Sequence, residues 1–265
     1  MNIVVCVKQV PEISEVKVNP ETGTLVREGV ASILNPFCEY ALDHALRIKQ
    51  ATPDVNITAI SMGPPQARAA LLRALELGAD RGVLVSDRRF AGADTWATAL
   101  TLAAAVRAVR EDFDLILVGK QAIDGDTAQV GPEMAEILGI PQIMYGVRME
   151  LTPNGKRLRV KRESENGYQV LEARLPVLVS ASKGEAIRRL PSFADILAAR
   201  QKPLEMITAD ALNLSEEQLG LQGSYTQVVK IFPPQAKKAC RKLEGLSPDQ
   251  AGREITSFLS QENFI

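Results

Sequence analysis

The sequence is poor in the residues that usually carry catalysis, metal binding or covalent cross-links. It has one histidine, His44, and three widely separated cysteines, Cys6, Cys38 and Cys240, which form no CxxC motif. This argues against a zinc site and against a disulfide framework, and it favours a reducing cytoplasm. A mechanism based on two histidines is excluded, and no nucleophile–base pair stands out. We therefore expect neither catalytic residues nor a metal site.

Excess charge of one sign and long apolar runs are also lacking. The net charge is −1, which gives no reason to expect binding to nucleic acid or to a membrane surface. No apolar run approaches the ~20 residues of a membrane span, and the first residues lack the features of a signal peptide. We expect a cytoplasmic protein with no nucleic-acid partner and no membrane insertion. Its 265 residues, 46% of them hydrophobic, are enough to bury a large core.

Apolar runs alternate with amphipathic segments in the first half of the chain. Four runs that suit strands buried on both faces occur at 3–7, 56–62, 82–86 and 115–118. Helices are expected after them, at 39–49, 64–77, 95–109 and about 128–138. This alternation predicts an α/β fold, a doubly wound and mostly parallel Rossmann-like sheet, with a nucleotide at the switch point between the first and fourth strands. We expect Trp96 in the core and assign His44 no role.

After Pro141 the pattern changes to alternating segments at 144–151, 157–163 and 168–175. The Asn-Gly pairs between them predict hairpins, so we expect an antiparallel extension of the sheet; a further small hairpin is expected within 15–27. Residues 1–200 are expected to form the nucleotide-binding domain, and 201–265 a C-terminal arm with a polar linker and an end helix from Pro248 to about Leu259. An arm with apolar anchors but little core of its own usually lies on another chain.

The most informative stretch is 114–141, which is typical of a strand, a glycine-bearing loop and a helix. The strand ends at Gly119, the loop continues through Gly125 and Asp126, and the helix ends at Gly139. Free N–H groups at a helix start, together with the helix dipole, favour an anion there. The loop has neither the Walker A lysine nor a GxGxxG pattern, so it predicts phosphate or nucleotide binding without naming the nucleotide. An ordinary strand–helix turn with two glycines remains an alternative.

The loop also carries two carboxylates, Asp124 and Asp126, which would repel a phosphate if they faced it. They must therefore turn away, bind loop N–H groups or accept hydrogen bonds from ribose hydroxyls. Gly125 allows a close approach of the backbone or a positive φ. We expect the Thr127 hydroxyl and the N–H groups of Ala128, Gln129 and Val130 to bind the phosphates.

Three polar residues elsewhere allow two interpretations each. Lys8 follows the first strand at the edge where open α/β sheets bind ligands, so it could meet the anion or be a solvated loop lysine. Asn35 could cap the following helix or face a ligand. Asp94 is a suitable N-cap for the helix that begins at Thr95, and a plain loop and cap is one interpretation of its stretch.

Four stretches together carry a family resemblance: Val5–Pro11 (VCVKQVP), Asn35–Cys38 (NPFC), Met62–Pro64 with Leu77–Gly82, and Val118–Pro132 (VGKQAIDGDTAQVGP). In this order and spacing they resemble the electron transfer flavoprotein β subunit, from Met1 to about Leu204. The form GDTAQVG from Gly125 is similar to the flavin-bifurcating branch, because the AMP-binding branch usually has a bulkier acidic residue at that position. The stretch Phe90–Thr95 (FAGADT) is similar to one that lies near the flavin in the bifurcating branch.

The resemblance implies an adenine-nucleotide-binding domain that holds FAD, which takes a hydride from NADH, and that pairs with an electron transfer flavoprotein α subunit. One electron would pass through the α-subunit FAD to an acyl-CoA-type dehydrogenase, and the other to ferredoxin or flavodoxin. The implied cofactor-binding residues are Cys6, Lys8, Asn35, Phe37, Cys38, Met62, Phe90, Gly92, Asp94, Thr95, Gly119, Lys120, Gln121, Asp124, Gly125, Asp126, Thr127, Ala128, Gln129 and Val130. The segment Ser182–Arg189 departs from the family pattern, which leaves the dehydrogenase open.

Two other interpretations remain. A housekeeping electron transfer flavoprotein β subunit would hold structural AMP in place of FAD. An adenylate-forming or pyrophosphatase-type enzyme on the same sheet would need an ATP-phosphate motif such as SGGxD, which the sequence lacks.

Overall fold

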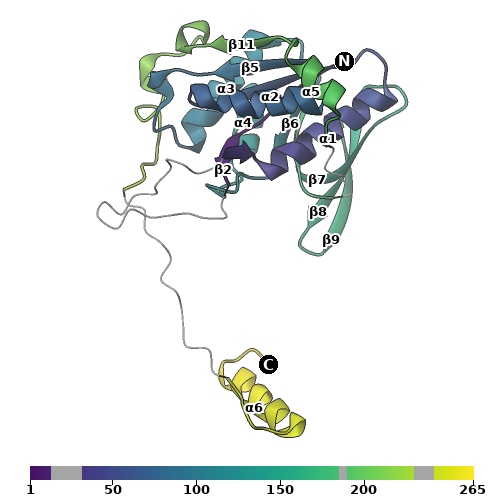
Figure 1. Cartoon of the computed structure of the whole chain (residues 1–265), viewed down its shortest axis with the longest axis vertical. Coiled ribbons are helices and arrows are strands. Elements are labelled where there is room, and N and C mark those ends of the chain that lie inside the picture. The colour runs from purple at the N-terminus through teal and green to yellow at the C-terminus, as the bar shows by residue number, and fades with distance from the viewer. Residues whose placement is uncertain (13–31, 185–189, 230–241) are drawn as a thin grey trace. The chain divides into compact units, whose positions relative to one another are not determined.

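The computed structural model describes residues 1–12, 32–184, 190–229 and 242–265 (Figure 1). The chain divides into two compact units, Met1–Lys230 and Ile231–Ile265. The second unit contains helix α6 (Pro248–Gln261), which begins where the sequence predicts because Ser247 and Gln250 form a capping box. The hairpin expected within 15–27 lies outside the described residues.

A nine-stranded sheet is the centre of the first unit, in the order β11-β5-β4-β1-β6-β10-β7-β8-β9. Its strands are β1 (Asn2–Cys6), β4 (Asn56–Met62), β5 (Arg81–Val85), β6 (Leu115–Gly119), β7 (Gln142–Leu151), β8 (Arg157–Ser164), β9 (Gly167–Arg174), β10 (Val177–Ala181) and β11 (Leu204–Ile207). Neighbouring strands are parallel except in the pairs β7–β8 and β8–β9, which form the predicted antiparallel extension. A separate antiparallel pair joins β2 (Gln9–Pro11) to β3 (Ser32–Leu34). The predicted α/β fold class is confirmed.

The strand order reverses beside β1. The chain runs from β1 to β4 and β5 on one side and then returns to β6 on the other. The carboxyl ends of β1 and β6 lie side by side, with Cys6 opposite Val118. Ligands of open α/β sheets bind outside such a reversal, so this edge is the expected position of the nucleotide-binding site.

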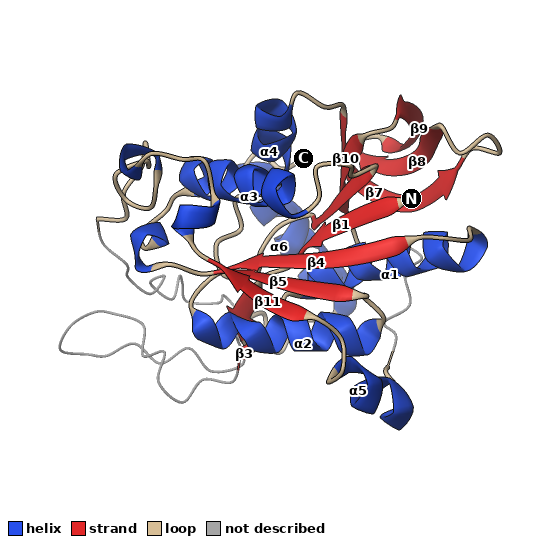
Figure 2. Ribbon diagram, turned by 90° about the horizontal axis from the view of Figure 1, so that it is seen from above, coloured by secondary structure: helices blue, strands red, loops and turns tan. Residues whose placement is uncertain are grey.

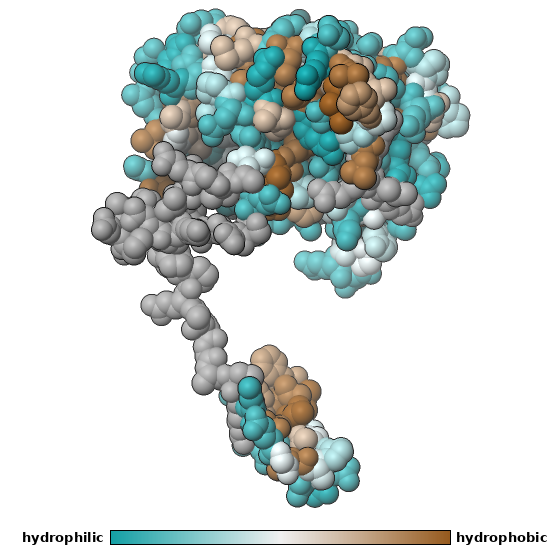
Figure 3. Space-filling view, in the orientation of Figure 1, coloured by the Kyte–Doolittle hydropathy of each residue, from teal (hydrophilic) through white to brown (hydrophobic). Residues whose placement is uncertain are grey.

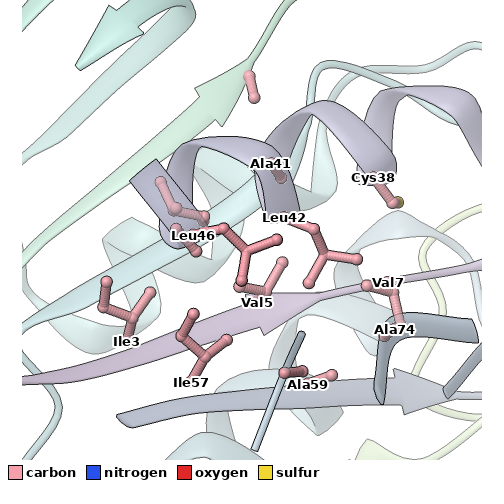
Figure 4. Packing of buried hydrophobic residues seen from close by; sticks show 14 of the residues in the cluster. Ile3, Val5, Val7, Cys38, Ala41, Leu42, Leu46, Ile57, Ala59 and Ala74 are labelled. Carbon is pink, nitrogen blue, oxygen red and sulfur yellow. The ribbon is translucent and has the colours of Figure 1, made fainter. Parts of the chain in front are cut away.

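Helices cover both faces of the sheet (Figure 2). One face carries α1 (Pro36–Ala51), α2 (Arg68–Leu77) and α5 (Phe193–Ala199), and the other carries α3 (Thr95–Val109) and α4 (Val130–Leu138). Because side chains alternate along a strand, Ile3 and Val5 of β1 pack in the cluster beneath α1 (Figure 4), whereas Val4 and Cys6 belong to the cluster on the opposite face. The continuous apolar runs are therefore explained by burial on both sides.

The structure differs from the sequence expectations at two points in this unit. Trp96 is only partly buried, and its ring centre lies 5.8 Å from that of Tyr225, because α3 begins at the carboxyl edge of the sheet and not beneath it. Strand β11 was not predicted, since its residues lie in the stretch interpreted as a polar linker. It pairs with β5, and the buried residues Leu212 and Leu219 that follow it also belong to the core of the first unit.

His44 provides a test of the core through pH. Its side chain is 3% exposed in α1, and burial, with a smaller effect of Arg47, lowers its pKa to about 4. In the unfolded chain this histidine has its ordinary pKa of about 6.5, so it binds a proton at pH values where the folded chain does not. The free energy of unfolding is therefore highest above pH 6.5, and it falls by about 3 kcal/mol as the pH drops towards 4. Replacing His44 with glutamine should remove this part of the pH dependence. Urea unfolding at neutral and acidic pH measures it, and an unchanged difference between the two pH values would contradict the assignment.

Candidate nucleotide-binding site

The residues that follow β1 and β6 contact each other at the carboxyl edge of the sheet. The Lys8 Nζ atom lies 2.8 Å from the carboxylate of Asp124 in the loop after β6. Both side chains are partly exposed, so this ion pair contributes little to stability. Its main effect is on charge, because it neutralises one of the two carboxylates that would otherwise repel a phosphate.

The second carboxylate, Asp126, is held inside the loop. It accepts a hydrogen bond from the Gln121 side-chain amide, and the Asp126 N–H donates to the Ala122 carbonyl at 2.8 Å. Asp126 and Ala128 have left-handed backbone conformations, with φ of 56° and 57°, which cost a non-glycine residue about 1–2 kcal/mol each. Of the two roles considered for Gly125, the positive φ is not adopted, and the close approach of a ligand stays a prediction. A Cβ added at Gly125 would have no other atom within 4 Å.

Asn35 connects the segments of the site. Its side chain is 1% exposed, and its Nδ2 donates to the Gln121 carbonyl at 2.8 Å while its Oδ1 accepts from the Ile123 N–H at 3.2 Å. The Asn35 N–H donates to the Lys8 carbonyl at 2.9 Å. Asn35 stands at the N-cap position of α1, but its side chain makes no capping bond. The cap interpretation is thus wrong for the side chain, whose polar atoms hold the loop.

Gly119 allows the start of α1 to approach the end of β6. A Cβ at this position would lie 2.8 Å from the Phe37 carbonyl carbon and 2.9 Å from the Cys38 nitrogen, both of which are backbone atoms. No side chain larger than hydrogen fits without a shift of the backbone. This close approach places the Asn35–Cys38 stretch beside the loop.

The start of α4 supplies unpaired hydrogen-bond donors. The helix begins at Val130, two residues later than expected, with Gln129 at the N-cap and no side-chain cap. The N–H groups from Thr127 to Gly131 have no acceptor in the described part of the chain, whereas the Glu133 N–H donates to the Gln129 carbonyl at 3.1 Å. Free donors at a helix start, reinforced by the helix dipole, suit a phosphate group. Ala128 thus belongs to the loop, although its N–H stays among the free donors.

The stretch Phe90–Thr95 reaches the same edge from the side of β5. The predicted cap is confirmed, because the Asp94 carboxylate accepts from the Ala97 N–H at 3.0 Å. Asp94 also accepts from the Thr226 N–H and hydroxyl at 2.9 and 3.0 Å, and the hydrogen bonds outweigh burial, so its pKa lies below the ordinary value. Phe90 is buried, and Gly92 has a φ of 77° with Leu221 packed against it. These side chains contact the protein, and their contact with a cofactor stays a prediction.

Glu133 is a site residue that the sequence did not reveal. Its Oε1 accepts a hydrogen bond from the Thr95 hydroxyl at 3.0 Å, which joins the starts of α3 and α4. Its Oε2 is buried with no partner among the described residues, and burial raises the pKa of this carboxyl. Only its position in the first turn of a helix could have suggested a role, and that signal is common to many structural carboxylates.

The other residues expected to bind the cofactor lie near the same edge of the sheet, but their side chains differ in burial and in contacts. The Cys6 and Cys38 thiols are buried, and burial raises the pKa of Cys6 to about 12, so it stays uncharged. Met62 ends β4 and is half-buried. Phe37 is half-buried, with its ring edge-on to that of Tyr40. Lys120 turns towards the antiparallel extension, where its Nζ lies 3.9 Å from the Glu163 carboxylate and 5.3 Å from the Tyr145 ring centre.

Comparison with known proteins identifies the family to which the chain belongs. Residues 22–212 match the family model described as the electron transfer flavoprotein domain. The chain belongs to the electron transfer flavoprotein family. It is 44% identical, over the full length of both chains, to the electron transfer flavoprotein subunit beta of Clostridium acetobutylicum, and 47% identical to that of Megasphaera elsdenii over 88% of each chain. It is also 42% identical, over the full length of both, to the caffeyl-CoA reductase-Etf complex subunit CarD of Acetobacterium woodii.

The residues of this electron transfer flavoprotein chain fit a flavin or adenine nucleotide with a negatively charged phosphate. Free backbone donors stand at the start of α4, Lys8 neutralises Asp124, and Asp126 is bound by Gln121 within the loop. The described residues contain no group of three side chains that could hold a metal ion, and none of their helices is long and apolar enough to cross a membrane.

Proposed function

We propose that this chain is the β subunit of an electron-bifurcating electron transfer flavoprotein and binds FAD at the carboxyl edge of β1 and β6. The observation that carries the proposal is the row of free N–H groups from Thr127 to Gly131, which would hold the pyrophosphate. Bound FAD would supply acceptance of a hydride from NADH and release of single electrons. The protein's own part is to bind and orient that cofactor, since the site offers no acid/base pair.

The proposed partners follow from the family and from one relative. We propose a heterodimer with an α subunit, whose FAD would pass one electron to an acyl-CoA-type dehydrogenase, while ferredoxin or flavodoxin would accept the other. The name of the caffeyl-CoA reductase-Etf relative supports a CoA-ester oxidoreductase as a partner. The protein is proposed to act in the cytoplasm.

Of the predicted arm 201–265, the part up to residue 230 belongs to the first unit, because β11 pairs with β5. We further propose that the remaining part, the second unit Ile231–Ile265, packs on the α subunit. Large apolar side chains are exposed in its helix α6, at Ile255 and Phe258, and just after the helix, at Phe264. Figure 3 shows apolar surface on this unit. Exposed apolar side chains of this size on a short helix favour burial against another chain.

The cofactor content of the heterodimer tests the proposal. Co-expression with an α subunit should give a complex with two FAD, one of them in this chain, and anaerobic NADH should reduce it rapidly. One FAD and one AMP, without reduction by NADH, would instead assign the chain to the housekeeping class.

Gly125 offers a second test, directed at the loop. Because nothing lies within 4 Å of an added Cβ and φ is ordinary, Gly125→Ala and Gly125→Asp should both fold as the parent does. Gly125→Asp should lower FAD affinity at least about tenfold, since it adds a negative charge beside the phosphates, whereas Gly125→Ala should retain it. FAD per heterodimer after gel filtration measures the effect. Equal FAD in both variants would place the phosphates elsewhere.

A further inference from the structure

The antiparallel extension presents one face of three strands to solvent. The register puts these side chains on the same face, here named the β7–β9 face: Arg148, Glu150, Arg157, Arg159, Lys161, Glu163, Tyr168, Val170, Glu172 and Arg174. The alternate residues of β8, Leu158 and Val160, are fully buried on the other side. The β7–β9 face is hence the outward side of the extension.

Positive charge is in excess on this face. Arg148, Arg157, Arg159, Lys161 and Arg174 stand against Glu150, Glu163 and Glu172. Arg159 is paired with Glu172 at 2.7 Å and Arg148 with Glu150 at 2.6 Å. Arg157 and Arg174 lie directly opposite each other, and neither has a carboxylate partner in the described part of the chain.

The Arg157–Arg174 pair is unfavourable for the sheet by itself. Like charges directly opposite each other on neighbouring strands are destabilising. Lys156 adds a third cation, and the three side chains line a surface cavity of about 510 Å³ together with the 154–155 turn and Asp114. The carboxylate of Asp114 is already engaged by the Asn2 N–H at 2.7 Å. An external anionic group would relieve this repulsion.

The opposite end of the same face is apolar. Tyr168 is 62% exposed and Val170 63% exposed, and the Lys161 Nζ lies 4.4 Å from the Tyr168 ring centre. From Tyr168 to Arg174 the strand runs about 20 Å, which exceeds the reach of a small anion. Exposed aromatic residues beside arginines are typical of protein interfaces.

The apolar end adjoins the candidate cofactor site. Glu163 stands directly opposite Tyr168 and accepts a hydrogen bond from the Ser182 hydroxyl at 2.7 Å. The same carboxylate lies 3.9 Å from the Lys120 Nζ, and Lys120 follows the last residue of β6. A protein seated on this face would therefore lie next to the edge that holds the nucleotide.

We propose that the β7–β9 face is the docking surface for a small acidic electron-carrier protein of the ferredoxin class. Carboxylates of the carrier would neutralise Arg157 and Arg174, and its apolar contact would cover Tyr168 and Val170 beside the cofactor. The proposal rests on the proposed function, which supplies the electron that the carrier accepts. Charge complementarity of this kind mainly sets orientation and the rate of association.

The test uses the FAD-loaded heterodimer and an acidic ferredoxin. Arg157→Glu with Arg174→Glu should weaken binding at least about tenfold at low salt, and the affinity of the parent should fall as salt rises from about 50 to about 300 mM. Arg157→Gln with Arg174→Gln should have an intermediate effect. Arg68→Glu, an exposed cation on α2 on the other face of the sheet, is the matched control and should bind as the parent does. NADH oxidation with an artificial dye should be unchanged in all variants.

Each outcome decides between this proposal and the one on which it rests. Ferredoxin affinity that is unchanged in the double glutamate variant, or undetectable in the parent, would overturn the docking surface while NADH reduction still supports the function. Loss of the α subunit from the variant complex would also overturn it and assign the face to the α subunit. Failure of NADH to reduce the parent complex would instead refute the proposed function.

Discussion

Replacing Asn35 with alanine should lower the free energy of unfolding by about 3 kcal/mol and reduce FAD affinity more than about tenfold. The substitution leaves the Gln121 carbonyl and the Ile123 N–H without their partner in a part-buried position, and each unpaired buried group costs about 1–3 kcal/mol. The loop would then lose the two hydrogen bonds to Asn35 that stabilise the conformation of its left-handed residues. Urea unfolding and FAD content per heterodimer measure the two effects.

Asn2 provides the matched control for Asn35. Its side chain donates to Asp112 at an exposed position, at the amino end of β1 and away from the site. Asn2→Ala should cost less than about 1 kcal/mol and leave FAD content unchanged. If Asn35→Ala behaved like Asn2→Ala in both measurements, the loop would not depend on Asn35.

Gly119→Ala is expected to be the most damaging single-methyl substitution at the site. Its Cβ would lie under 3 Å from backbone atoms of Phe37 and Cys38, which cannot move as a side chain can. The start of α1 must then shift away from β6, at a cost of about 2–3 kcal/mol. Thermal or urea unfolding measures the loss, with Gly125→Ala as the control in the same loop region. Equal stability of the two variants would show that α1 can move without penalty.

Most of the fold could be predicted because its signals are local. Continuous apolar runs predicted the buried parallel strands, and Asn-Gly turns predicted the antiparallel extension. Strand β11 was missed because only four residues form it, and Glu205 and Met206 among them are exposed, so neither length nor apolar pattern distinguishes it from a linker. Trp96 was misplaced because its neighbour Tyr225 lies more than a hundred positions away.

The site could be located but not built from the sequence. The strand–loop–helix order gave its position, yet the contacts that shape it are long-range: Asn35 reaches residues 86 and 88 positions away, and Thr95 reaches Glu133 across 38. The start of α4 was placed two residues early because Gln129 provides no capping side chain that the sequence could show. The left-handed conformations of Asp126 and Ala128 were missed for a different reason. Gly125 beside them is the residue type that usually adopts a positive φ, so the sequence pointed to it instead.

Strand β11 also bears on how far this chain can be shortened. It pairs along β5, and the Lys202 Nζ fixes its approach by donating to the Leu75 and Ala79 carbonyls at 2.9 and 2.7 Å. A chain cut at residue 200 would leave β5, whose last four residues are buried, as an open edge with a row of unpaired N–H and C=O groups. Such an edge is a template for pairing with other molecules. A shortened protein that ends before Ile207 would therefore be prone to aggregate, whatever becomes of its cofactor site.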